Sequence, residues 1–79
     1  MSKTIDFPDL DAAIDAESWL WLQDAAPVYA DAIAAEVKRG HAPGDIRQRF
    51  MRLTQRPALA LRLEQAARHL QRQRQEAGQ

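Results

Sequence analysis

Apolar residues recur along the chain at intervals of three and four, in four segments separated by proline, glycine or short polar turns. This spacing is typical of amphipathic helices and not of strands, whose apolar positions alternate. The apolar series are Leu10, Ile14 and Trp21, with Glu17 or Ala13 between them; Val28, Tyr29, Ala32, Ile33 and Val37; Ile46, Phe50 and Leu53; and Leu59, Leu63, Ala66 and Leu70. The pattern therefore predicts four helices and no sheet.

Prolines and one glycine set the predicted helix ends. Pro27, Pro43 and Pro57 each begin a segment, and a proline in the first turn costs no internal hydrogen bond. Gly40 follows two basic residues and is typical of a left-handed helix terminator. The predicted helices are 8–24, 27–39, 43–54 and 57–75, with fraying ends at 1–6 and 75–79. Because the connections are short, consecutive helices must turn back on one another, which predicts a compact all-α bundle in a single domain.

The stretch WLWL, residues 19–22, places four large apolar side chains in a row. Successive helical residues are about 100° apart, so these four cover most of the helix circumference. Trp19 and Trp21 are about 200° apart, and one core cannot take both. In one interpretation Leu20 or Leu22 and one tryptophan fill the core, while the other tryptophan lies at its edge. In the other, the second tryptophan anchors an interface.

The small size of the chain favours the interface. A domain of 79 residues buries only roughly 60–65% of the surface of its unfolded chain. The sequence has no cysteine, which excludes disulfides, and His41 and His69 lack the thiolates of a typical zinc site, so we expect no zinc site. We therefore expect a homodimer or a partner protein, with Tyr29 or Phe7 beside the exposed tryptophan.

The net charge of zero conceals a separation of charge along the chain. Residues 1–37 contain one basic and eight acidic residues, whereas residues 38–79 contain ten basic and three acidic ones. Such asymmetry indicates either two halves that attract each other or two surfaces that meet different partners. Glu64 is placed to pair with Arg68 one helical turn later. Five arginines surround the junction of the third and fourth helices: Arg47, Arg49, Arg52, Arg56 and Arg62.

Candidate catalytic residues are sparse. Neither histidine has a nucleophile or carboxylate arranged for it in sequence, and there is no glycine-rich phosphate loop. The acidic run from Asp6 to Asp15 lacks the central glycine of a calcium loop and is explained as a helix start. We expect no enzymatic activity, no metal and no cofactor. The sequence shows no signal peptide or membrane-spanning stretch, which predicts a cytoplasmic protein.

Three stretches carry a resemblance to a group of phage proteins. AESWLWLQDAAPVYADAI, EVKRGHAPGDIRQRFM and RPALALRLEQAARHL resemble small helical proteins from the early regions of Mu-like transposable phages and prophages. The resemblance covers roughly residues 16 to 70. It implies a helical phage accessory protein that binds and redirects a host protein, such as a transcription regulator, a motor ATPase or a defence complex. It assigns no functional residue.

The predicted function is therefore binding and inhibition of a host protein by occluding its surface. The expected apolar anchors are Trp19, Trp21 and Tyr29. The expected residues for electrostatic steering towards an acidic target are Arg47, Arg49, Arg52 and Arg56.

Two alternatives remain open. The first is a small DNA-binding transcriptional regulator that places the third helix in a groove, with arginines on phosphates and Gln48 or Gln55 on base edges. The eight acidic residues of residues 1–37 count against DNA binding, because their charge repels the phosphate backbone. The second is a structural role through self-association alone.

Overall fold

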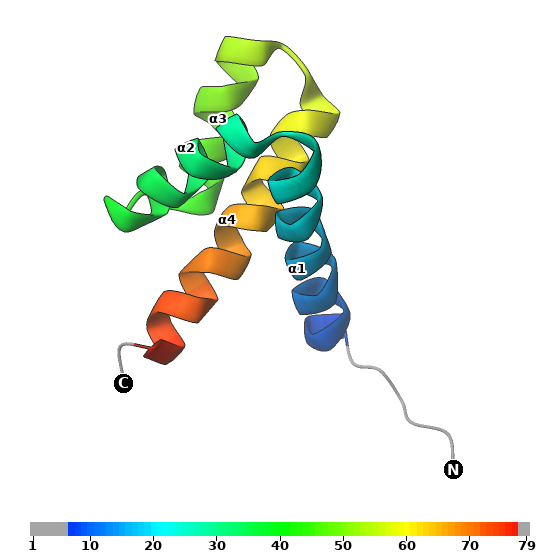
Figure 1. The fold of residues 1–79 in the computed structure, drawn as a ribbon, viewed down its shortest axis with the longest axis vertical. Coiled ribbons are helices and arrows are strands. Elements are labelled where there is room, and N and C mark those ends of the chain that lie inside the picture. Colours follow the sequence, from blue (N-terminus) through cyan, green and yellow to red (C-terminus); the bar gives the residue numbers. More distant parts are fainter. Residues whose placement is uncertain (1–6, 78–79) are drawn as a thin grey trace.

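The computed structural model describes the backbone of residues 7–77 and the side chains of residues 10–77. It contains four helices, α1 (Phe7–Ala25), α2 (Pro27–Lys38), α3 (Pro43–Thr54) and α4 (Pro57–Ala77), and no strand in the described range (Figure 1). The predicted all-α bundle is confirmed, with boundaries within two residues of those expected. Residues 75–77 belong to α4, whereas the ends 1–6 and 78–79, which we expected to fray, lie outside the described residues, as does the side chain of Phe7.

Local sequence accounts for the helix ends. Helices α2, α3 and α4 each begin at a proline, as predicted. Helix α2 ends where Gly40 takes a left-handed conformation with φ of +91°. The amide of Gly40 donates to the carbonyl of Val37 at 2.9 Å, and the amide of His41 donates to that of Glu36 at 3.1 Å. These two bonds satisfy carbonyls that the helix end leaves free, and they turn His41 back onto α2.

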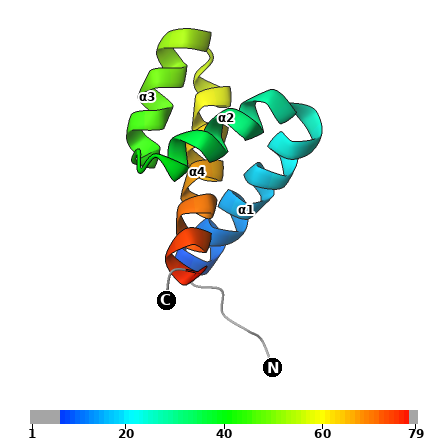
Figure 2. The same cartoon turned by 60° about the vertical axis from the view of Figure 1, so that its left-hand side comes forward.

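Helix α4 lies at the centre of the molecule. Helix α1 runs antiparallel to it, and α3 packs along it near its start (Figure 1). In Figure 2, α2 crosses in front of α4, with α3 on one side and α1 on the other. Helices α1 and α3 do not pack against each other within the described part of the chain. Three sides of α4 are therefore covered, and the side between α1 and α3 is open.

The hydrophobic core lies where α2, α3 and α4 meet the C-terminal half of α1. The apolar series of α4 is confirmed as its buried face: Leu63 and Ala66 are buried, and Leu59 and Leu70 pack at the edge. Small side chains on α4 let the other helices approach closely. The buried cluster consists of Leu22, Ala30, Ile33, Val37, Ile46, Phe50, Leu63, Ala66 and Ala67.

The buried face of α1 is not the one that its apolar series marks. The series correctly predicts a helix, but Leu10, Ile14 and Trp21 are all exposed. The side turned to α4 carries Asp15 and Ser18, both buried, before it reaches Leu22. Polar contacts to α4 fix this orientation and are described below. Two other positions also differ, since Val28 on α2 and Leu53 on α3 belong to apolar series but are highly exposed.

Candidate functional site

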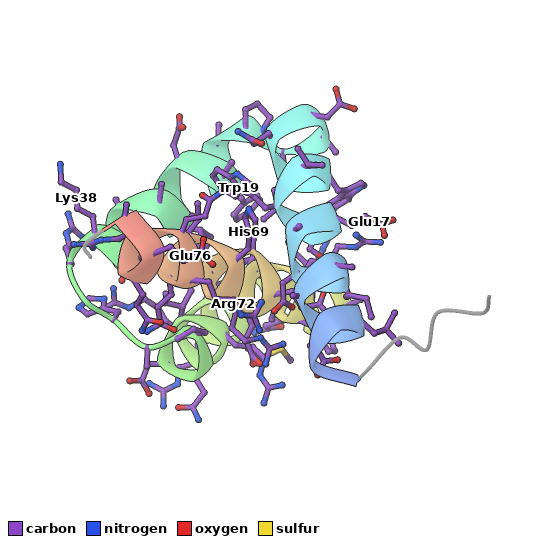
Figure 3. The ribbon with its side chains drawn as sticks, turned by 90° about the horizontal axis from the view of Figure 1, so that it is seen from below. Glu17, Trp19, Lys38, His69, Arg72 and Glu76 are labelled. Carbon is purple, nitrogen blue, oxygen red and sulfur yellow. The ribbon has the colours of Figure 1, made fainter. Side chains whose placement is uncertain are left out.

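The four residues of WLWL have different environments. Leu22 is completely buried, and Trp19 is half-buried against the core. Figure 3 shows Trp19 pointing towards α2 and α4, on the side of α1 opposite Glu17. Leu20 and Trp21 are exposed. Leu22 and Trp19 thus belong to the core region, and Trp21 is the outer tryptophan. That Trp21 anchors an interface stays a prediction.

Trp21 is held against the start of α4. The guanidinium of Arg62 lies 4.5 Å from the centroid of the Trp21 ring, a distance typical of a cation–π contact. The indole is 40% exposed. Together with Gln55, Arg56, Pro57 and Leu59 it lines a shallow cavity of about 550 Å³. Trp21 and Arg56 are thus near each other, as an interface that combines aromatic and basic residues requires.

Tyr29 lies on α2 and does not line the cavity beside Trp21. It is half-buried and packs edge-on against Phe50, with ring centroids 6.1 Å apart and an interplanar angle of 71°. This geometry is the favoured arrangement for two aromatic rings, and it ties α2 to α3. The three predicted aromatic anchors therefore do not form one patch, because Trp19 and Tyr29 are integrated into the core and its edge.

Arg49 belongs to a group of ionic contacts around Glu36. Its Nη1 atom donates to both carboxylate oxygens of Glu36 at 3.0 Å. His41 and Arg39 contact the same carboxylate, Arg39 at 3.4 Å. The hydrogen bond from His41, with the charges of Arg49 and Arg39, lowers the pKa of Glu36 although burial acts in the opposite direction. The group joins α2, the turn after it and α3.

Arg47 belongs to a second group, which runs across three helices. Its Nε atom lies 3.5 Å from Glu64, and Glu64 lies 3.7 Å from Arg68, which confirms the pair predicted within α4. Arg68 also approaches Asp15 at 3.5 Å, and Arg72 donates to Asp15 at 2.7 Å. The contacts run from Arg47 of α3 to Glu64 of α4, and from Arg68 and Arg72 of α4 to Asp15 of α1. The group therefore links α3 to α4 and α4 to α1.

Asp15 has a role that the acidic run does not predict, because aspartates at a helix start are expected to be solvated. Asp15 is only 1% exposed. One turn later, Ser18 donates to the side-chain oxygen of Gln65 at 2.6 Å. The available signal was the four-residue spacing of Arg68 and Arg72, which places two cations on one side of α4 for a carboxylate on a neighbouring helix.

Arg52 and Arg56 form no ion pair with any other described residue. Arg52 lies on the outer side of α3 and, with Gln48, Arg49 and Leu53, lines a cavity of 440 Å³. Leu53 is 72% exposed. We call these four residues, Gln48, Arg49, Arg52 and Leu53, the α3 surface. It combines a free guanidinium and an apolar side chain on a rigid helix.

The described residues offer no other type of site. No three of their histidine, aspartate and glutamate side chains form a group that could hold a metal ion. No helix in the described range is long and apolar enough to cross a membrane.

Comparison of the chain with protein-family models, with curated proteins and with solved structures found no match. The resemblance to early-region proteins of Mu-like phages therefore stays a prediction.

Proposed function

We propose that this protein acts by binding another protein through the α3 surface. The observation that carries the proposal is the exposure of Leu53 beside Arg52. Arginine is enriched at protein interfaces, and an exposed apolar side chain beside it adds area that a partner can bury. The charge of Arg49 is matched by Glu36, so the surface is only moderately basic.

The proposed mechanism is occlusion. Leu53 would enter an apolar depression on the partner, while Arg52 and Arg56, which have no ion pair among the described residues, would steer an acidic surface into place. The resemblance to phage early-region proteins supports a host protein as the partner. Binding would then block the surface on which the host protein recognises its own partner or DNA.

A second candidate function is DNA binding. The observation that favours it is the connection of α2 to α3 by the four residues 39–42, with Gly40 at the left-handed position. This arrangement is similar to a helix-turn-helix unit, in which the second helix enters the major groove. The internal pairing of Arg47 and Arg49 leaves few cations for phosphates, which favours the protein partner.

The test is affinity capture from a nuclease-treated bacterial lysate at moderate salt. Tagged wild-type protein is compared with Leu53→Ser and with the matched control Val28→Ser, which removes an equally exposed apolar side chain from α2. We expect one stoichiometric protein to be retained by the wild type and the control and to be lost from Leu53→Ser. Both positions are exposed, so the variants should fold alike.

The DNA-binding function predicts a different result. Nucleic acid would be captured from untreated lysate at low salt, and its binding would weaken steeply as salt rises. Arg52→Gln with Arg56→Gln would abolish that binding, whereas Leu53→Ser would leave it unchanged. This outcome would replace the proposed function with the second candidate.

A further inference from the structure

Exposed apolar side chains of three helices border the open side of α4. Five large apolar residues there are each 36–45% exposed. They are Leu10, Ile14 and Trp21 of α1, Met51 of α3 and Leu61 of α4. We call these five residues the open face.

Contacts within the molecule place the α1 residues on this face. Trp19 points towards α2 and α4 (Figure 3), while Trp21 contacts Arg62 of α4. Leu10 and Ile14 precede Trp21 at helical intervals and lie along the same side of α1. This side of α1 therefore faces away from α2 and borders α4.

Contacts of α3 and α4 place the other two residues. Arg49 reaches Glu36 of α2, so the opposite flank of α3, with Arg47 and Met51, faces away from α2. Leu61 lies on the same line of α4 as Arg68, one of the residues that reaches α1. Met51 and Leu61 thus border the open side from two directions.

We propose that the open face is covered by the open face of a second copy of this chain, in a two-fold symmetric dimer. The two α1 helices would lie antiparallel, each between α1 and α3 of the other copy. A two-fold axis brings the same patch of both subunits together, so the patch must be complementary to itself. The apolar side chains satisfy this condition directly.

The charges on the open side are also complementary between two copies. Glu17 lies in the α1 series between Ile14 and Trp21, projects away from the core (Figure 3) and has no ion pair among the described side chains. The ionic group beside it holds three arginines against two carboxylates, Asp15 and Glu64. Arg68 and Arg72 are partly exposed cations of this group, with Asp11 one turn before Asp15, and the α1 series supplies an anion, Glu17.

In an antiparallel arrangement the anion of each copy meets the cations of the other, so the same contact forms twice. A two-fold axis near the middle of the series places Glu17 of one copy beside Ile14 of the other. Ile14 precedes Asp15, where Arg68 and Arg72 are each 41% exposed at their side chains. Glu17 of each copy would thus face the arginine-rich junction of α1 and α4 on the other, while Leu10 would meet Trp21.

The test measures the dissociation constant of the full chain by sedimentation equilibrium. We expect the wild type to dimerise and Ile14→Gln to raise the dissociation constant about tenfold or more, because an apolar contact is lost in both copies. Val28→Gln is the matched control on α2 and should dimerise as the wild type does. Circular dichroism checks that both variants keep their helical content.

A second pair of variants tests the charges. Glu17→Lys should also weaken the dimer, whereas Asp31→Lys, which makes the same change on the exposed side of α2, should not. A wild type that stays monomeric at every concentration, or an Ile14→Gln variant that dimerises normally, would overturn the proposal. Assembly beyond a dimer would contradict the closed two-fold arrangement. None of these results depends on Leu53, so the proposed function is tested separately.

Discussion

Two residues at helix ends show how single positions shape this molecule. Gly40 and Gln55 both adopt left-handed backbone conformations, with φ of +91° and +56°. Glycine does so without steric cost, whereas the Cβ of glutamine is strained there. Thr54 supports the turn at Gln55, because its hydroxyl donates to the carbonyl of Phe50 and accepts from the amide of Arg56.

We therefore predict that Gln55→Gly stabilises the protein by about 0.5–1 kcal/mol, the relief of strain being partly offset by the greater freedom of glycine in the unfolded chain. Urea unfolding followed by circular dichroism measures the change. Gln55→Ala keeps the Cβ and should remain close to the wild type. A glycine variant less stable than the alanine variant would show that the position is not strained.

The pKa of Glu36 provides a prediction about pH. Because the pKa is lowered in the folded state, the carboxylate stabilises the fold above its ordinary value of 4.5. This contribution is lost as the pH falls below that value and Glu36 takes up a proton. The unfolding free energy of the wild type should therefore fall more steeply with acid than that of Glu36→Gln.

Urea unfolding at a series of pH values between neutral and acid measures this difference. Glu76→Gln, an exposed position near the end of α4, serves as the control and should retain the steep dependence of the wild type. Parallel curves for the wild type and Glu36→Gln would contradict the assigned role of the Glu36 contacts.

At the scale of the elements, α1 is the helix whose buried face differs most from its apolar pattern. Its existence and limits follow from the apolar spacing and the helix-forming residues around WLWL. Its orientation does not, because polar contacts of Asp15 and Ser18 with α4 decide which side is buried. For α4, by contrast, the apolar series and the buried face coincide, since its neighbours contact it through apolar side chains.

A double-mutant cycle tests the link between α1 and α4. Asp15→Asn and Arg72→Gln should each destabilise the protein, and their coupling energy should be about 1 kcal/mol, because Arg72 is partly exposed and solvent weakens the pair. Asp15→Asn combined with Arg52→Gln is the control, for which we expect no coupling. Additive effects of Asp15→Asn and Arg72→Gln would mean that the contact does not orient α1.

At the scale of the whole molecule, part of the separation of charge along the chain is matched by ion pairs within the fold. Asp15 and Glu36 come from the acidic half, and each binds arginines of the basic half. Attraction between the two halves, one of the two possibilities that the sequence left open, is therefore present in the fold. Arg52 and Arg56 remain for the proposed partner, and Glu17 for the proposed second copy.

The sequence by itself determined the four helices, their ends and the bundle. Proline, glycine and the apolar spacing act over a few residues, so their effects can be predicted locally. Only the tertiary structure decided which tryptophan is exposed, which arginines are paired and which side of α1 is buried. These depend on contacts such as Ser18 with Gln65 and Asp15 with Arg72, which are 47 and 57 residues apart in the chain. No local pattern specifies such pairings, because several arginines could have met the same carboxylate.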